Sequence, residues 1–178
     1  MMKVLFDTNI IVTFLTRRAD PYLQETSALF QLCADGKFLG YVALQTIPVV
    51  WYVMRKIPNY ERRNNLMSIC NLFKLAVTDM ENVQQALSNI AFSDFEDCLQ
   101  NCCAQSVGAD YIVTANVRDY EGHSDVKAVT PSELLDILQD FDTDTQWEVR
   151  EQSIEYNSHG SDTPIQTHLH ILLVSHAA

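Results

Sequence analysis

The chain has 178 residues, 47% of them hydrophobic and 20% charged, and a formal net charge of −11. This size and apolar content are typical of one ordinary domain that builds its core without disulfides, so we expect the five cysteines to be free thiols. No apolar run approaches the ~18–20 residues that a membrane span requires, and the run before Asp7 is too short for a secretory signal. We therefore expect a cytoplasmic protein with no membrane association.

The negative charge is unevenly distributed along the chain. Residues 140–178 hold seven acids and one arginine, which leaves sixteen acids and eleven bases, a net charge of −5, in residues 1–139. The later segment is polar and shows no helical or strand period, so we predict a poorly ordered acidic tail over residues 140–178. Residues 1–139 are predicted to form the folded domain, whose acidic balance argues against an extended nucleic-acid-binding surface.

Short apolar runs alternate with longer amphipathic stretches. We expect strands over residues 3–6, 39–43, 74–77, 111–114 and 126–129. Helices are expected over residues 10–15, 21–36, 45–56, 59–73, 78–90, 93–107 and 130–138. This alternation predicts a parallel sheet covered by helices on both faces.

Three helix starts carry a Ser/Thr-x-x-Glu pattern, which is the signature of a capping box. The three pairs are Thr78 with Glu81, Ser93 with Glu96, and Thr130 with Glu133. We expect each Ser or Thr to be the N-cap and each Glu to be its capping partner.

Polar side chains follow two of the predicted strands. Asp7 ends the first strand, and Asn116 and Asp119 follow the strand that ends at Thr114. Ligands of an open parallel sheet bind at the carboxyl ends of its strands, which favours a functional site here. Two structural roles remain open, because Asp7 could be a helix N-cap and the other two could be turn residues.

The helix predicted over residues 93–107 begins with acidic side chains. Asp94, Asp97 and Asn101 share one face, and the apolar side that includes Phe95 and Cys98 is expected to be buried. Oxygen ligands without histidine or thiol suit Mg²⁺ or Mn²⁺, which can activate water and stabilise charge on a phosphodiester. The acids could instead only stabilise the helix dipole.

Three segments in this order resemble the motifs of the PIN domain family, in particular its VapC-like toxin branch. They are Phe6–Ile11 (FDTNII), Asp94–Asp97 (DFED) and Ala109–Tyr120 (ADYIVTANVRDY), and the resemblance covers roughly residues 2–139. It implies a three-layer α/β/α fold with a parallel central sheet. It also implies a Mg²⁺- or Mn²⁺-dependent ribonuclease that cleaves RNA, forms a homodimer and pairs with a small antitoxin protein.

The resemblance also implies which residues form the site. Asp7, Asp97 and Asp119 would be metal ligands and catalytic residues, Asn116 would complete the catalytic set, and Asp94 would be a further ligand. The sequence departs from the family pattern at Val49, where a second acid, a glutamate, is expected. An alternative is therefore a weak or inactive PIN-fold module that binds RNA or protein.

Three arginines are candidates for binding RNA phosphates. Arg118 lies beside the predicted site, and Arg62 and Arg63 are adjacent in the helix predicted over residues 59–73. Near a helix C-terminus such residues could instead only stabilise the dipole. Two other enzyme classes are disfavoured: the first strand lacks the acidic pair of a phosphoacceptor, and the five glycines form neither a Rossmann nor a P-loop pattern.

Overall fold

The structure is a computed structural model that describes residues 1–17 and 20–140. The prediction of a tail over residues 140–178 lies, apart from Asp140, outside the described residues. Asp140 itself belongs to a helix that begins at residue 131.

The core of the molecule is a five-stranded parallel sheet with the order β3-β2-β1-β4-β5. Its strands are β1 (Lys3–Phe6), β2 (Leu39–Ala43), β3 (Lys74–Ala76), β4 (Tyr111–Val113) and β5 (Lys127–Val129). All four pairings are parallel. The first strand lies at the centre of the sheet, as expected for the run that is apolar at every position after Lys3.

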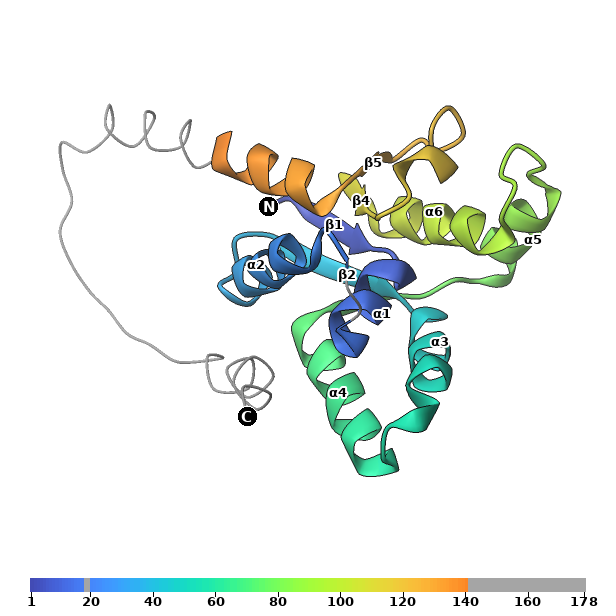
Figure 1. The fold of residues 1–178 in the computed structure, drawn as a ribbon. Helices are drawn as coiled ribbons and strands as arrows, with labels where there is room; N and C mark the ends of the chain where they lie inside the picture. The colour runs from blue at the N-terminus through green and yellow to red at the C-terminus, as the bar shows by residue number, and fades with distance from the viewer. Residues whose placement is uncertain (18–19, 141–178) are drawn as a thin grey trace, which may run out of the picture.

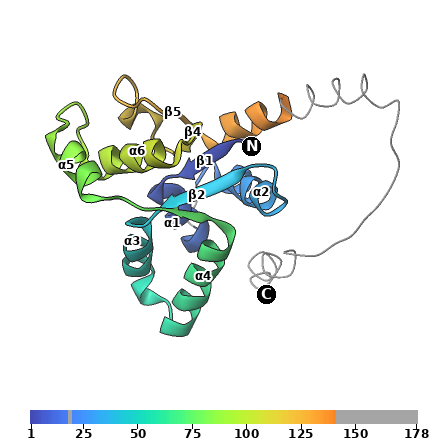
Figure 2. The ribbon, with the colours of Figure 1, turned by 180° about the vertical axis from the view of Figure 1, so that it is seen from behind.

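Helices pack on both faces of this sheet (Figures 1 and 2). They are α1 (Thr8–Thr16), α2 (Leu23–Ala34), α3 (Thr46–Val53), α4 (Asn59–Leu72), α5 (Met80–Ser88) and α6 (Phe95–Val107), followed by the helix over residues 131–140. Two short 3₁₀ turns, η1 (Met54–Lys56) and η2 (Val117–Asp119), complete the described elements. The predicted three-layer α/β/α fold is confirmed.

Alternate side chains of β1 enter two separate apolar cores. Val4 and Phe6 contribute to the core under α1, α2, α4 and the 131–140 helix, whereas Leu5 contributes to the core under α5 and α6. All three are fully buried. Phe6 packs edge-to-face on Phe30 of α2, with 5.4 Å between ring centroids, so the strand is anchored from both sides.

Gly40 in β2 allows the side chains of Phe73 and Cys33 to pack directly against the strand. A Cβ atom at this position would lie 2.6 Å from Cδ1 of Phe73 and 2.7 Å from Sγ of Cys33. Only a residue without a side chain permits this close approach of the strand to the α4 end. Phe73 thereby reaches Phe6, with 5.1 Å between the ring centroids.

One of the three predicted capping boxes is confirmed and two are wrong. Thr130 and Glu133 exchange the expected hydrogen bonds. In α5 the box is formed by Asp79 and Asn82 instead, and the N-cap of α6 is Asp94 instead of Ser93. The N-cap of each helix lies one residue later than predicted, because an aspartate follows the Ser or Thr and its carboxylate accepts a hydrogen bond from a backbone amide of the first helical turn.

One side chain of α6 is exposed where the sequence predicted burial. Phe95 is 46% exposed, in contrast to the predicted burial, whereas Cys98 and Asn101 are buried. The Asn101 side chain accepts a hydrogen bond from Ser124, at 2.7 Å, and so is engaged in packing. Within the described parts of the chain, every helix is too short or too polar to cross a bilayer.

Candidate functional site at the carboxyl edge of the sheet

The register of two central strands brings Asp7 and Thr114 together. Phe6 of β1 pairs with Val113 of β4, and each strand is followed by one of these polar residues. The backbone N–H of Asp7 donates to the Val113 carbonyl at 2.9 Å. The two side chains therefore leave the sheet at the same edge.

Asp7 is held by two side-chain donors. Its side chain is 3% exposed, and its Oδ2 accepts hydrogen bonds from Oγ1 of Thr114 at 2.7 Å and from Nδ2 of Asn9 at 2.8 Å. Although Asp7 occupies the N-cap position of α1, its side chain caps no amide. The backbone amides of Thr8 and Asn9 nevertheless act to lower the pKa of Asp7, so the carboxylate interacts with the first turn of α1 as well as with Thr114.

Asp97 faces a group of acidic side chains from three segments. Burial and then the charges of Asp7 and Asp94 raise the pKa of Asp97 to about 7, and Asp119 and Glu96 act in the same direction. Burial likewise raises the pKa of Asp7, against the opposing effect of its hydrogen bond with Thr114. Carboxylates crowded in this way repel one another, and a bound cation would offset that repulsion.

The remaining predicted acids and Asn116 lie at the rim of this group. Asp94 has a structural role as the α6 N-cap, because its Oδ1 accepts from the Glu96 amide at 2.6 Å. Asn116 is the N-cap residue of η2, and its backbone N–H donates to Oγ1 of Thr114 at 3.0 Å. Asp119 ends η2. The structure thus brings Asp7, Asp94, Asp97 and Asp119 into one electrostatic environment, with Asn116 next to it.

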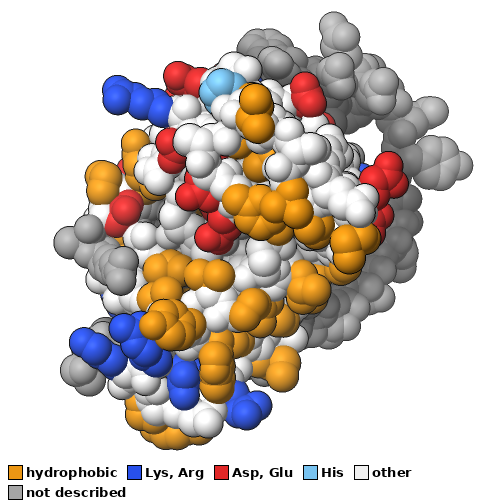
Figure 3. All heavy atoms as spheres, turned by 90° about the vertical axis from the view of Figure 1, so that its right-hand side faces the viewer, with side chains coloured by type: hydrophobic (Ala, Val, Ile, Leu, Met, Phe, Trp, Pro, Cys, Tyr) orange, Lys and Arg blue, Asp and Glu red, His pale blue; other side chains and the backbone are white. Residues whose placement is uncertain are grey.

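The candidate arginines are divided between two places. Arg118 lies in η2, directly before Asp119. The guanidinium groups of Arg62 and Arg63 instead lie over the ring of Trp51, at 4.0 Å and 5.5 Å from its centroid. Figure 3 shows acidic side chains on the upper half of one face and most of its Lys and Arg side chains at the lower end, with hydrophobic side chains between them.

A buried polar contact joins three helices one helical turn before Val49. Oγ1 of Thr8 (α1) and Oγ1 of Thr46 (α3) are 2.9 Å apart, and Nε2 of Gln100 (α6) donates to Thr8 at 2.7 Å. Val49 follows Thr46 by one helical turn and so lies on the same side of α3. The residue at the position where the family pattern has an acid is thus a valine, one helical turn from a polar contact with the residue after Asp7.

Three residues of the site were missed by sequence reasoning. Thr114 and Asn9 orient Asp7, and Tyr120 is buried with its hydroxyl unpaired among the described residues. A polar residue at the end of an apolar strand was an available signal for Thr114. For Tyr120 the sequence carries none, because its burial depends on packing against Phe92 from a distant segment.

The acidic side chains at this edge offer oxygen ligands, the kind that a hard cation binds. The described part of the chain contains no group of three His, Cys, Asp or Glu side chains already arranged around a metal position. The chemistry of the set nevertheless fits Mg²⁺ or Mn²⁺, because it consists of carboxylate oxygens, and their charges add to the effect of burial in raising the pKa of Asp97. Asp7 and Asp97 are therefore the residues that would hold such an ion.

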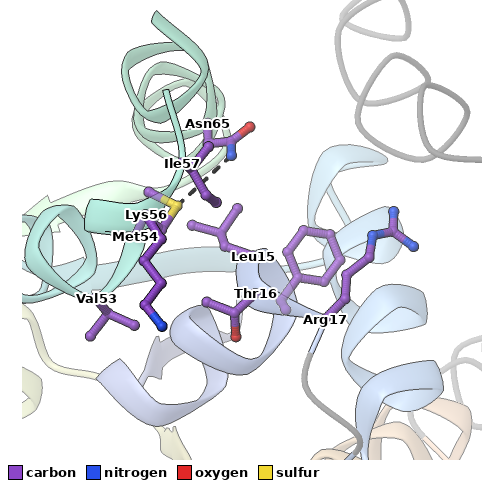
Figure 4. Close-up of a pocket in the computed structure, with 9 residues that line it drawn as sticks. Leu15, Thr16, Arg17, Val53, Met54, Lys56, Ile57 and Asn65 are labelled. Atoms are coloured by element: carbon purple, nitrogen blue, oxygen red, sulfur yellow. Dashed lines mark hydrogen bonds between the residues drawn. The ribbon is translucent and has the colours of Figure 1, made fainter. Parts of the chain in front are cut away.

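Two apolar hollows lie apart from this site. The pocket of about 380 Å³ in Figure 4 is lined mainly by residues of α1 and by the segment from Val53 to Ile57, which includes η1, and no acid lines it. A second hollow of about 520 Å³ is lined by Trp51, Arg63 and Met67 among others. In this region Val50 and Met54 are buried in the core. Neither hollow includes the carboxylates.

Comparison with known proteins gives concordant results. The sequence profile of the PIN domain matches residues 3–118, and no curated protein sequence matches significantly. The fold is similar to VapBC2 from Rickettsia felis bound to a promoter DNA fragment, with a TM-score of 0.56 and 14% identity over 72% of this chain and 98% of that one. It is also similar to DNA-bound VapBC from Salmonella typhimurium, with a TM-score of 0.53 and 18% identity over 74% and 99% of the two chains. VapBC-1 from nontypeable Haemophilus influenzae gives a TM-score of 0.51 and 16% identity over 74% and 99%.

Proposed function

Because this chain belongs to the PIN domain family, we propose that it is a divalent-metal-dependent endoribonuclease, the toxin of a toxin–antitoxin pair. The observation that carries the proposal is the gathering of Asp7 and Asp97 with Asp94 and Asp119 at the carboxyl edge of the sheet. Carboxylates that raise one another's pKa are characteristic of functional sites. Structural stability alone would not favour such a group.

Each residue has a distinct role in this proposal. Asp7, Asp97 and Asp119 hold the cation, and Thr114 and Asn9 keep the Asp7 carboxylate in one orientation. Bound Mg²⁺ or Mn²⁺ would supply an ionised water at neutral pH and neutralise charge on the scissile phosphate. Asn116 contributes an uncharged amide, which can donate to a phosphate oxygen without adding negative charge.

RNA would reach this acidic site along cationic side chains. Arg118 is next to Asp119 and can contact the phosphate nearest the cleaved bond, and Arg62 and Arg63 can hold a more distant part of the strand. Trp51, on which both guanidinium groups lie, offers a surface for stacking an unpaired base. Single-stranded RNA is the substrate class that fits this combination.

A small antitoxin and a second copy of the chain are the proposed protein partners. The similar solved structures are VapBC complexes, which supports an antitoxin. Exposed apolar side chains such as Tyr52 (64%) and Met67 (62%) provide the kind of surface that partners cover.

Val49 supports a second candidate function. With one acid fewer than the family pattern, the chain could keep the fold and bind RNA or protein without cleaving RNA. A cation would then be held more weakly, because each carboxylate contributes to its affinity. The two functions differ in one observable, which is turnover.

Cleavage of a mixed RNA pool by the purified full chain tests the proposal. We expect cleavage with Mg²⁺ or Mn²⁺, loss of cleavage in EDTA, and loss in Asp7→Asn and Asp97→Asn. Asp136→Asn, at an exposed acid of the 131–140 helix, is the matched control and should cleave like the wild type. Absence of cleavage by the wild type, with Mn²⁺ binding retained, would favour the binding module.

A further inference from the structure

Exposed apolar side chains lie at the carboxyl edge of the sheet, beside the acidic group. Leu44 and Val77 directly follow β2 and β3, and the Leu44 backbone N–H donates to the Ala76 carbonyl at 3.0 Å. The two side chains are 46% and 60% exposed, and Met80, the first residue of α5, is 70% exposed. Leu44, Val77 and Met80 form what we call the edge patch. Because β2 pairs with β1, this patch borders the strand end that carries Asp7.

Asp97 reaches the same edge through the contacts of α6. Nε2 of Gln100, one helical turn after Asp97, donates to Oγ1 of Thr8 at 2.7 Å. The same nitrogen lies 3.4 Å from Oγ1 of Thr46. Thr8 directly follows Asp7, and Thr46 begins α3. The first turn of α6, with its acids, therefore lies beside the ends of β1 and β2.

Cationic side chains gather away from these acids, around the far end of α3 and on α4. Residues 46–72 hold four bases against one acid, in a chain that is acidic overall. Arg62 donates to the Trp51 carbonyl at 3.4 Å. Arg63 donates to Oδ1 of Asn59 at 3.1 Å, and within the described residues neither arginine has a carboxylate partner. In Figure 3 acidic, hydrophobic and basic side chains follow one another from the upper to the lower part of one face.

An acidic end and a basic end on either side of an apolar patch form a self-complementary surface. In a dimer with two-fold symmetry both subunits use the same surface. An axis through the edge patch then sets the acidic end of one copy against the basic end of the other. Burial of the patch and attraction between the ends favour this same arrangement.

We propose that a second copy of the chain docks on the edge patch, and that Arg62 and Arg63 of the partner subunit complete each active site. In one subunit these arginines lie over Trp51. In the dimer they face the acidic end of the other copy, where they bind RNA phosphates that the negative site would otherwise repel. The shared active site rests on the proposed function, whereas the interface does not.

Sedimentation equilibrium of the full chain tests the interface without any activity. We expect a dimer whose dissociation constant rises about tenfold or more in Arg62→Glu with Arg63→Glu, because like charges then face each other. Val77→Asp should weaken the dimer as well, because it places a charge in the edge patch. Lys127→Glu, at an exposed position of β5, is the control and should dimerise like the wild type.

Mixing two defective variants tests whether the arginines act across the interface. Asp97→Asn, and Arg62→Gln with Arg63→Gln, should each cleave RNA poorly alone. In a mixed dimer one active site combines both defects, and the other combines the intact Asp97 of one copy with the intact arginines of the other. An equal mixture should regain about a quarter of the wild-type activity, because half of randomly formed dimers are mixed and each has one intact site. Arginines that served their own subunit would leave the mixture inactive.

The outcomes separate this inference from the proposed function. A wild type that stays monomeric, or an Arg62→Glu with Arg63→Glu variant that dimerises like the wild type, overturns the interface and leaves the edge patch to the antitoxin. A mixture that regains no activity overturns the shared active site, while cleavage by the wild type still supports the proposed function. If the wild type dimerises but cleaves no RNA, the proposed function and the shared active site are both wrong, and sedimentation still decides the interface.

Discussion

The hydroxyl of Thr114 donates a 2.7 Å hydrogen bond to Oδ2 of Asp7, although the two residues are 107 positions apart in the chain. The bond exists because β1 and β4 are neighbours in the sheet and end at the same edge. It partly compensates the burial of the Asp7 carboxylate. The same hydrogen bond therefore contributes to the stability of the fold and to the orientation of the candidate ligand.

Removing this donor should affect both properties. In Thr114→Val, which keeps the branched shape, we expect the free energy of unfolding to fall by about 1–3 kcal/mol, because a buried carboxylate is deprived of a hydrogen bond. RNA cleavage should fall as well. Urea unfolding measures the first effect. Thr78→Val, which removes a hydroxyl near Cys103 at the end of β3, is the control for cleavage, and equal cleavage in both variants would contradict the role given to Thr114.

The stability of the metal-free protein should decrease as the pH rises. The pKa of Asp97 is raised from 3.8 to about 7, so between these values the folded protein retains a proton that the unfolded chain has released. The stabilisation is complete below pH 3.8 and is lost as the pH rises through about 7. Asp7 acts in the same direction.

Urea unfolding in EDTA across this pH range measures the effect. Asp97→Asn should flatten the dependence and be more stable than the wild type at pH 8, by a modest amount because Asp97 is only about half buried and solvent screens its interactions. Asp136→Asn should retain the wild-type slope. A wild type that becomes more stable between pH 5 and pH 8 would contradict the prediction.

Replacing Val49 with an acid should strengthen the site. Val49 lies one helical turn after Thr46, which contacts Thr8 at the start of α1. In Val49→Glu we expect Mn²⁺ to bind about tenfold more tightly, which corresponds to about 1.4 kcal/mol, and RNA cleavage to increase. Isothermal titration calorimetry measures the affinity. Val49→Gln has the same size without the charge, and an equal gain in this control would show that charge is not the cause.

Arg62 and Arg63 should contribute to RNA affinity by neutralising phosphates. Reversing both charges (Arg62→Glu with Arg63→Glu) should weaken binding and reduce the slope of log affinity against log salt by about 0.7 for each phosphate that is no longer neutralised. Fluorescence anisotropy with a labelled RNA at several salt concentrations measures this slope. Lys127→Glu, at an exposed position of β5, is the control. An unchanged slope in the double variant would exclude both arginines from the RNA-binding surface.

The sequence predicted the elements well wherever the signal was local. The bounds of β2 and the first residue of α4 agree with the prediction. Hydrophobic periodicity and flanking turn residues define these positions in the sequence. The errors at α5 and α6 have a common cause. A Ser or Thr and an Asp compete for the N-cap, and the backbone conformation of the folded chain decides between them.

The sequence by itself determined the parallel α/β/α architecture and the position of Asp7 and Asp97 near one sheet edge, because these follow from the order of apolar runs and from residues adjacent to them. Only the tertiary structure decided that Asp7 accepts a hydrogen bond from Thr114, and that the side chain of Tyr120 is buried. Such relationships depend on strand register and on burial from several segments. These properties arise when distant parts of the chain pack together, and no local pattern encodes them.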